Sequence, residues 1–304
     1  MRFDWYQGTI QDDVQSVLLH LSGDRFKVRQ DCDGLARSYL YERGFTITNL
    51  QTNEEIMVLS DGNNGKNGTH FIASSQVAQS VSDQVRSRWC DSHHVTRADA
   101  CQDLHGQGLF KSVVKASRKV ARKYKLSAEF IQDPCNPLAG ATQYLGARKS
   151  DYRGRAYQKG LEIRSKLINT LQEEQPRVDA VDFFKHLQYE MPDGSKVNPS
   201  DVVRVEAQIR PRTKVGKQIL SKVDPSECFG FSHWLQEWAK YVLAFDAVKL
   251  DVRGEKKSDF DHKCEWMVKQ YHPVITEILD CYGSDGAGGF LEHLLKLHGI
   301  RPKQ

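Results

Sequence analysis

Three segments of the chain carry polar or ionisable side chains at every second position, and each includes arginine. Alternate residues of an extended strand face the same side of a sheet. The alternating sets are Arg97, Asp99, Cys101 and Asp103 in 94–103, Arg155, Tyr157 and Lys159 in 153–159, and Arg204, Glu206, Gln208 and Arg210 in 201–210. A sheet with one face in water would alternate in the same way. That interpretation is the alternative for each strand taken alone.

The chemistry that these residue types suggest together is phosphodiester transfer. A tyrosine oxygen can attack phosphorus and become covalently linked to it. Arg155 and Lys159 stand two residues to either side of Tyr157, where their charges can offset that of the phosphoryl oxygens. Carboxylates such as Asp99 and Glu206 suit a hard divalent metal, which prefers oxygen ligands and polarises phosphate.

A second signal is a run of basic residues in 110–125, FKSVVKASRKVARKYK, which contains no acidic residue. We expect a helix here with an apolar side and a basic side. Residues three or four positions apart form a continuous stripe on a helix, and the members of this stripe are Lys111, Lys115, Arg118, Arg122 and Lys125. A charge run is often only a solvated surface, but a stripe of a single sign favours contact with a polyanion.

Hydrophobic periodicity predicts an α+β fold, mainly an antiparallel sheet with flanking helices, followed by a helical C-terminal region. The expected strands are 2–10, 70–74, 94–103, 141–148, 153–159 and 201–210, and the expected helices are 75–89, 110–125, 160–173, 230–247, 260–282 and 287–298. We place a domain boundary near residue 220. It separates a region 1–220 that carries the chemistry from a helical region 221–304.

The bulk composition excludes several classes of protein. The 304 residues include 39% hydrophobic and 27% charged residues, with a net charge of +4, as in an ordinary globular protein. No apolar run is long enough to span a bilayer, and the N-terminus does not resemble a signal peptide. The seven cysteines form no CxxC pair, so we expect reduced thiols and a cytoplasmic protein.

Four stretches of the sequence resemble the replication initiation factor family of rolling-circle plasmids and filamentous phages. VTRADACQD (95–103) resembles its Thr-Arg-x-Asp strand. TQYLGARKSDYRGRAYQKGLE (142–162) resembles its Tyr-x-Gly-x-Arg-x-Ser and Arg-x-Tyr-x-Lys signature, and DVVRVEAQIRP (201–211) its Arg-x-Glu-x-x-x-Arg strand. HFIASSQVAQSVSDQVRSRW (70–89) resembles the segment before the first acidic strand. The likeness covers about residues 1–240, and 224–238 is similar to a phage branch of the family.

The resemblance implies a metal-dependent nickase of a bacterial host's cytoplasm. Such an enzyme cuts one strand at a phage or plasmid origin, stays linked to the 5′ phosphate through tyrosine and leaves a 3′ hydroxyl primer. Tyr157 matches the nucleophile, with Tyr152 and then Tyr144 as the next candidates. Asp99 and Glu206 match ligands of Mg²⁺ or Mn²⁺, and Asp4 and Asp103 are weaker candidates. The residues expected to contact DNA are Lys111, Lys115, Arg118, Arg122, Lys125, Arg148, Arg204 and Arg210.

The partner implied is origin DNA, single-stranded or in a cruciform, and no membrane. A host helicase, a host polymerase and a second copy of the chain are further candidate partners. Two other functions fit the same residues. One is a non-enzymatic origin-binding protein that recruits a host nuclease, and the other is a conjugative or transposition nickase.

Overall fold

Strand β12 (Val202–Ile209) lies inside a large antiparallel sheet, between β6 (His93–His105) and β9 (Tyr152–Gln158), and all its residues are buried. The protein is described here by a computed structural model, which places residues 1–23, 26–31, 36–37, 39–62, 68–135, 140–174, 184, 186–252 and 259–298. Because both sides of β12 are buried, this strand does not have one face in water, which was the alternative interpretation of its alternating sequence. Its polar residues must therefore find partners within the protein.

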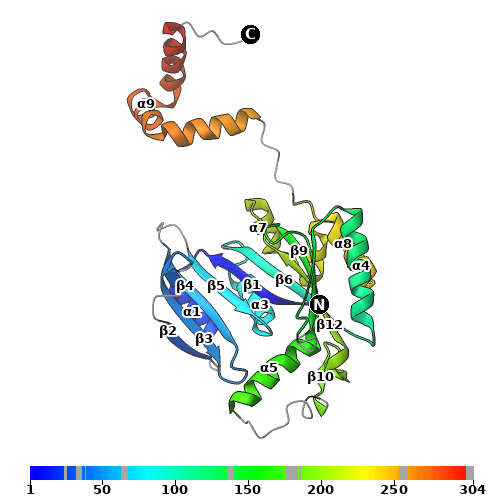
Figure 1. Cartoon of the computed structure of the whole chain (residues 1–304). Helices are drawn as coiled ribbons and strands as arrows, with labels where there is room; N and C mark the ends of the chain where they lie inside the picture. Colours follow the sequence, from blue (N-terminus) through cyan, green and yellow to red (C-terminus); the bar gives the residue numbers. More distant parts are fainter. Residues whose placement is uncertain are drawn as a thin grey trace. The chain divides into compact units, whose positions relative to one another are not determined.

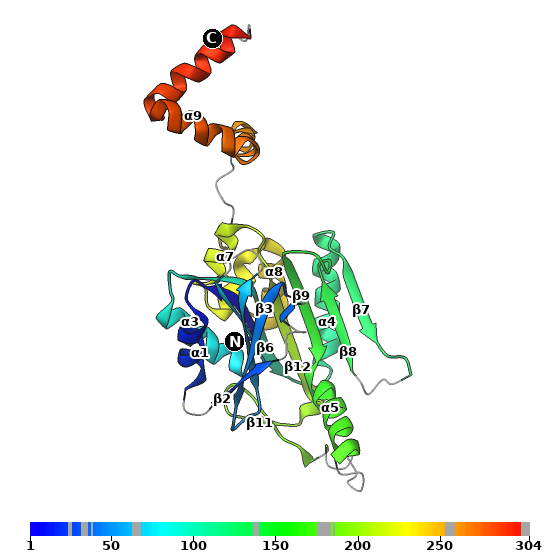
Figure 2. The ribbon, with the colours of Figure 1, turned by 90° about the vertical axis from the view of Figure 1, so that its left-hand side faces the viewer.

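The sheet has ten strands, and every neighbouring pair runs antiparallel (Figure 1). Their order across the sheet is β2 (Phe26–Asp31), β3 (Tyr41–Asn49), β4 (Glu55–Gly62), β5 (Thr69–Ser74), β1 (Arg2–Ile10), β6, β12, β9, β8 (Ala141–Leu145) and β7 (Ala128–Gln132). Figure 2 shows β7 at the outer edge, beside β8. A separate ribbon pairs β10 (Tyr189–Glu190) with β11 (Lys196–Val197). The predicted α+β class with a mainly antiparallel sheet is confirmed.

Helices pack on the apolar side of this sheet around one continuous core. Val203 and Val205 of β12 share that core with Val113 of α4 and with Leu235 and Trp238 of α8. The helices with residues in this core are α1 (Val14–Ser22), α3 (Val77–Arg88), α4 (Leu109–Lys123), α7 (Lys214–Leu220) and α8 (His233–Leu243), together with the 3₁₀ turn η3 (Pro225–Phe231). The chain also forms α5 (Lys159–Glu174), the 3₁₀ turn η2 (Pro199–Asp201) and α9 (Asp259–Leu297). Figure 1 shows α4 beside α8 on this side.

The tight fit between β9 and α8 explains why Gly154 occupies its position. A Cβ atom built on Gly154 would lie 2.9 Å from the Trp238 ring. Trp238 is fully buried, and its indole N–H donates to Ser117 Oγ of α4 at 2.9 Å. This contact joins α4, α8 and the sheet strand that carries Tyr157.

Most strands and helices expected from periodicity are present within a few residues of their predicted ends. The segment 11–62, for which periodicity predicted no element, forms α1, β2, β3 and β4. The expected helices 260–282 and 287–298 run together as α9, which is interrupted at Tyr271 and at Gly283, where φ is 67°. No helix in the described part of the chain is long and apolar enough to cross a membrane.

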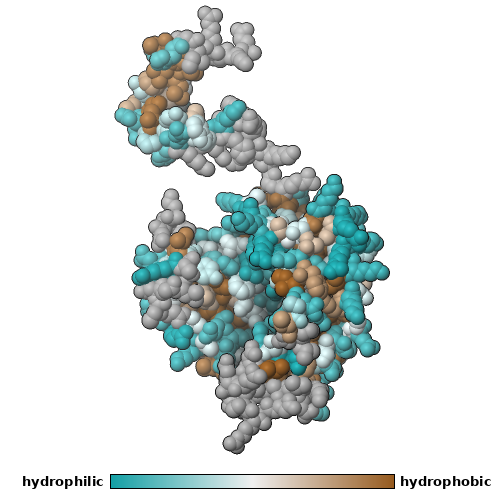
Figure 3. Space-filling model, in the orientation of Figure 1, coloured by the Kyte–Doolittle hydropathy of each residue, from teal (hydrophilic) through white to brown (hydrophobic). Residues whose placement is uncertain are grey.

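By packing, the chain divides into a unit of residues 1–254 and a unit of residues 255–304. The 3₁₀ turn η3 and helix α8 therefore belong to the same core as the sheet. The predicted boundary near residue 220, between a catalytic region 1–220 and a helical region 221–304, does not coincide with this division by packing, and the functional assignment of the two regions stays a prediction. Within the second unit, α9 exposes many large apolar side chains, which appear as brown patches in Figure 3.

We predict that a chain ending after Asp224 fails to fold, whereas one ending after Gly254 folds. The shorter chain lacks Phe229, Leu235 and Trp238, which are fully buried. Truncating a single buried Phe or Trp costs about 3–5 kcal/mol, against a total stability of about 5–15 kcal/mol. Thermal melts followed by near-ultraviolet circular dichroism measure this. A cooperative melt of the shorter chain near the full-length Tm would show that η3 and α8 are dispensable.

Candidate active site and nucleic-acid interface

The three strands singled out by their alternation, β6, β12 and β9, are neighbours in the sheet, and their polar faces coincide. Arg204 of β12 lies opposite Asp103 of β6 and Tyr157 of β9, and Glu206 lies opposite Arg155. The apolar residues between them face the helices. The predicted site residues of these strands therefore form one patch on the side of the sheet away from α4 and α8.

Arg204 organises one half of this patch and is itself almost completely buried. Its Nε donates to Asp103 Oδ1 at 2.6 Å, its Nη2 to Asp103 Oδ2 at 2.8 Å, and its Nη1 to Asp4 Oδ1 at 2.7 Å. The Tyr189 hydroxyl of β10 donates to Asp103 Oδ2 at 2.7 Å, and Arg2 Nη2 lies 3.3 Å from the same oxygen. Burial opposes ionisation of Asp103, but the hydrogen bonds from Arg204 lower the pKa of its carboxyl below the ordinary value.

This network bears on two expectations, both of which stay predictions. Arg204 was expected to contact DNA, but all three of its nitrogens are engaged inside the protein. Asp103 was expected as a weaker metal ligand, but both of its oxygens already accept hydrogen bonds. A buried ion pair of this kind is strongly destabilising to break, because removing one partner leaves an uncompensated buried charge.

Glu206 occupies the other half of the patch and is completely buried. Arg155 donates to its Oε2 from Nε at 2.8 Å and from Nη2 at 2.5 Å. Its other oxygen, Oε1, has no hydrogen-bond partner. Burial raises the pKa of Glu206 to about 7; the Arg155 charge opposes the rise, and the nearby Asp4 and Asp99 add to it.

Asp99 is the carboxylate on β6 that was expected to share a metal with Glu206. Arg97 donates to its two oxygens at 2.9 and 2.5 Å, and Gln208 Nε2 donates at 3.0 Å. Among the described residues, no group of three or more His, Cys, Asp or Glu side chains is arranged to hold a metal ion. The carboxylates thus form ion pairs with arginines, and the unpartnered Glu206 Oε1 is the atom best suited to accept a cation.

Tyr157 lies beside Arg155 at the edge of this patch and is 8% exposed. A hollow of about 180 Å³ opens next to it, lined by Gly140, Ala141, Thr142, Arg155, Tyr157, Gln158 and Glu162. The Arg155 guanidinium lies 4.8 Å from the centre of its ring, and the Lys159 ammonium lies 5.8 Å from it.

Arg155 and Lys159 were expected to offset the charge of the phosphoryl oxygens, but in the free protein the cations near Tyr157 do not make its phenolate favourable. Burial raises the pKa of the Tyr157 hydroxyl well above its usual value, and the neighbouring Glu206 carboxylate adds to the rise. Arg204 and Arg155 only partly oppose it. Lys159 is also not the last residue of a strand, because it begins α5 and donates to Glu162 at 2.9 Å.

The face of the sheet on which each side chain lies changes the order of the two alternative nucleophiles, Tyr152 and Tyr144. Tyr152 packs against Phe231 on the core side of the sheet, with ring centres 5.7 Å apart. Tyr144 of β8 lies opposite Arg155 and therefore shares the face of Tyr157, with the Arg153 guanidinium 3.7 Å from its ring centre. Tyr144 is thus a better placed alternative than Tyr152, the reverse of the order expected from sequence.

Four arginines lie on the tyrosine face, Arg97, Arg153, Arg155 and Arg210, and the first three are ion-paired with Asp99, Glu129 and Glu206. Burial lowers the pKa of Arg210, and the charges of the other three lower it further. The Nε atoms of Arg153 and Arg210 are buried without hydrogen-bond partners. Mutual repulsion and unpaired N–H groups are both relieved by a bound anion, so this arginine cluster is suited to phosphate.

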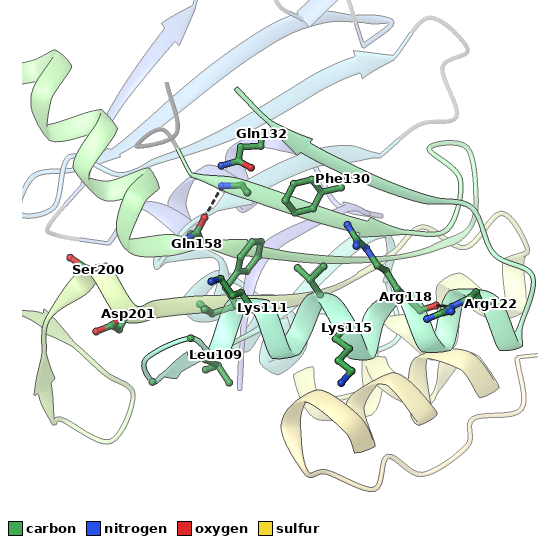
Figure 4. A pocket seen from close by; sticks show the side chains of 16 residues that line it. Leu109, Lys111, Lys115, Arg118, Arg122, Phe130, Gln132, Gln158, Ser200 and Asp201 are labelled. Atoms are coloured by element: carbon green, nitrogen blue, oxygen red, sulfur yellow. Dashed lines mark hydrogen bonds between the residues drawn. The ribbon is translucent and has the colours of Figure 1, made fainter. Parts of the chain in front are cut away.

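The basic stripe of α4 lies on the other side of the sheet. Lys111, Lys115, Arg118 and Arg122 line a groove of about 630 Å³ between α4 and the edge strand β7, whose lining also includes Phe130 and Gln132 (Figure 4). Figure 3 shows hydrophilic side chains gathered over α4. Lys125 follows the helix in a left-handed conformation and lines an adjoining hollow with Arg118 and Arg122. The basic stripe and Tyr157 were both expected to contact DNA, which suggested that they share one surface. In the structure they lie on opposite sides of the sheet.

Two further predicted DNA contacts differ in their surroundings. Arg148 follows β8, is exposed, and donates to Glu129 Oε1 at 2.8 Å. Arg210 belongs to the arginine cluster described above. Sequence reasoning missed Arg153, which shares the parity of Arg155, and Tyr189. The parity rule identifies Arg153, but no local pattern connects Tyr189 to Asp103, which is 86 residues away in the chain.

Comparison with known proteins yields little beyond this geometry. No protein-family model matches the chain. No curated protein matches it either. Among solved structures it is similar to a rolling circle replication initiator protein from Geobacillus stearothermophilus, with 16% sequence identity, 83% of this chain and 98% of that chain covered, and a TM-score of 0.43. A likeness this distant supports no functional assignment by itself.

We predict a pH dependence of stability that reports on Glu206. Its pKa is raised from 4.5 to about 7 in the folded protein, so the unfolded chain releases its proton first. Wild-type stability should therefore fall, relative to Glu206→Gln, as pH rises from about 4.5 to about 7, by about 3 kcal/mol in all. Urea unfolding of both proteins across this range measures the difference. A constant difference would mean that folding does not raise the pKa of Glu206.

Proposed function

We propose that this protein is a rolling-circle replication initiator that nicks one strand of a phage or plasmid origin with Tyr157. The observation that carries the proposal is the position of Tyr157 on a strand beside a cluster of four arginines, two of which, Arg153 and Arg210, have an unpartnered Nε–H group. The motif resemblance of β6, β9 and β12 supports the same function, because its residues converge on one patch.

The arginine cluster is the element that binds the scissile phosphate in this mechanism. Phosphate oxygens take the free N–H groups of Arg153 and Arg210, and the guanidinium groups offset the charge that develops on phosphorus. Arg155 lies between the phosphate site and Glu206, and it holds the tyrosine ring from one side. A phosphate that enters the hollow beside Tyr157 is thereby positioned for attack.

The reaction exchanges one phosphodiester for another. The Tyr157 oxygen forms a bond to phosphorus, and the bond from phosphorus to the 3′ oxygen of the preceding nucleotide breaks. The products are a 5′ phosphotyrosine and a free 3′ hydroxyl. Because burial raises the pKa of Tyr157, its proton leaves as the bond forms, and the leaving 3′ oxygen ends with a proton.

A divalent metal, Mg²⁺ or Mn²⁺, is part of the proposal. When bound, such an ion polarises the phosphate and stabilises the leaving oxygen. Glu206, through its unpartnered Oε1, and Asp99 are the residues that would hold it. Asp4, whose Oδ1 accepts a hydrogen bond from Arg204, is a further candidate metal ligand at the patch.

The proposed partner is origin DNA, single-stranded or extruded as a cruciform, because the hollow beside Tyr157 is too small for paired strands. A host helicase and polymerase would extend the primer. A second copy of the chain is a further proposed partner, and the exposed apolar side chains of α9 support it.

We predict that Tyr157→Phe binds origin DNA as the wild type does but forms no covalent adduct, because only the attacking oxygen is removed. The assay incubates supercoiled origin DNA with protein and divalent metal and looks for relaxation and a protein-linked 5′ end. Tyr152→Phe is the matched control and should retain full activity, since its ring packs in the core. An adduct formed by Tyr157→Phe would move the role to Tyr144. No adduct from the wild type would favour a non-enzymatic origin-binding protein.

We predict that chelation with EDTA abolishes nicking, and that added Mg²⁺ or Mn²⁺ restores it. Glu206→Gln and Asp99→Asn should each lose at least about 100-fold in nicking rate, comparable to loss of one strong electrostatic contact in a transition state. Circular dichroism checks that both variants stay folded. Full nicking in EDTA would remove the metal from the mechanism.

A further inference from the structure

The groove between α4 and β7 combines features of a nucleic-acid site that the nicking reaction itself does not require. Its lining contains four basic side chains, Lys111, Lys115, Arg118 and Arg122, and one acidic side chain, Asp201. None of the four cations forms an ion pair within the described part of the chain. By contrast, Lys123 on the same helix is bound to Glu237 at 2.5 Å. The helix therefore uses its charge on the α8 side in an ion pair, whereas its charges on the groove side have no ion-pair partner among the described residues.

An aromatic ring lies among these cations. Phe130 of β7 is 42% exposed, although a buried ring is the norm for phenylalanine. The Arg118 guanidinium lies 5.6 Å from its ring centre, and Phe110 of α4 lies 6.4 Å from it. Figure 4 shows Arg118 extending from α4 toward Phe130. Phosphate-binding cations and an exposed stacking surface therefore occur side by side.

An exposed ring among cations distinguishes single-stranded from duplex DNA. In a duplex the faces of the bases are stacked on one another, so a protein ring can stack on a base only where the strand is unpaired. The basic stripe from Lys111 to Arg122 runs about 16 Å along α4 at about 1.5 Å per residue. That length matches about three to five nucleotides of one strand.

The groove also adjoins the hollow beside Tyr157. Ala141, the first residue of β8, and Gln158, the last residue of β9, line both. The Gln158 side chain accepts a hydrogen bond from the Ala141 N–H at 3.1 Å, which joins the two strand ends. The two sites lie on opposite faces of the sheet and meet at this end of β8 and β9.

We propose that the groove between α4 and β7 binds single-stranded DNA, which passes around the ends of β8 and β9 to reach Tyr157. The strand's phosphates pair with the cations of α4, and one of its bases stacks on Phe130. This inference rests on the proposed nicking function for its route to Tyr157. The binding of single strands in the groove stands on the groove alone.

The test measures binding of a fluorescent oligothymidine about 16 nucleotides long, the upper end of known site sizes, and of a duplex of equal length. All proteins are full-length and carry Tyr157→Phe, so that no cleavage intervenes. Lys115→Ala with Arg118→Ala should weaken single-strand binding at least about tenfold. It should also reduce the slope of log affinity against log salt by about 1.4, which is about 0.7 for each phosphate contact.

A matched control removes the same charge elsewhere. Lys214 and Lys217 line a different hollow, beside the start of β6, and changing both to Ala should leave single-strand binding and its salt slope almost unchanged. Equal weakening by the control pair and the groove pair would overturn the assignment of the groove. Equal loss of single-strand and duplex binding in the groove pair would overturn the choice of a single strand.

Phe130 supplies a readout that charge alone does not change. Phe130→Ala should weaken single-strand binding between about 5-fold and about 100-fold and leave the salt slope unchanged, while Phe130→Trp should restore affinity. The added indole should be quenched by the oligothymidine and not by the duplex. Unchanged affinity in Phe130→Ala, or no selective quenching, would overturn the stacking contact.

Nicking by the same groove variants, with Tyr157 intact, separates this inference from the proposed function. If the wild type nicks and the groove pair nicks equally fast on subsaturating origin DNA, the route from groove to tyrosine is wrong. If the wild type does not nick at all, the proposed function fails, and the binding measurements still decide whether the groove holds a single strand.

Discussion

The ion pair between Arg204 and Asp103 is the interaction on which the arrangement of the site depends. It joins β12 to β6 through two hydrogen bonds, and the third guanidinium nitrogen reaches Asp4 of β1. Removing one partner from a buried pair leaves an uncompensated charge and typically costs about 3–5 kcal/mol. The pair thus supports the register of β12 with β6, while the separate pairing of β12 with β9 sets Tyr157 opposite Arg204.

Once Arg204 and Asp103 are paired with each other, the remaining side chains of the patch carry more positive than negative charge. Arg155 neutralises Glu206, and Arg97 neutralises Asp99. Arg153 and Arg210 retain unpaired N–H groups. The same burial that raises the pKa of Glu206 and of Tyr157 also keeps water from screening these cations. An anion that reaches the patch therefore meets a stronger field than it would at an open surface.

The fold could be read from sequence where the pattern is local. Alternation with a period of two predicted β6, β9 and β12, and the basic stripe predicted α4, because both periods arise within a single element. The strands β2, β3 and β4 were not predicted from the sequence. In β3, for instance, Phe45 and Ile47 alternate with Thr46 and Thr48, but the alternation is confined to these few residues. The candidate residues Tyr157, Glu206 and Asp99 were identified for the same local reason.

By itself, the sequence determined which residues share a strand face, and hence that arginines, carboxylates and a tyrosine would face one way. Only the tertiary structure decided which of these residues are free. The pairing of β12 with β6 brought Asp103 to Arg204, so that each is engaged by the other inside the protein. The packing of α4 on the apolar side of the sheet placed its stripe opposite Tyr157. Such outcomes depend on contacts between residues far apart in the chain, and no periodicity within one segment encodes them.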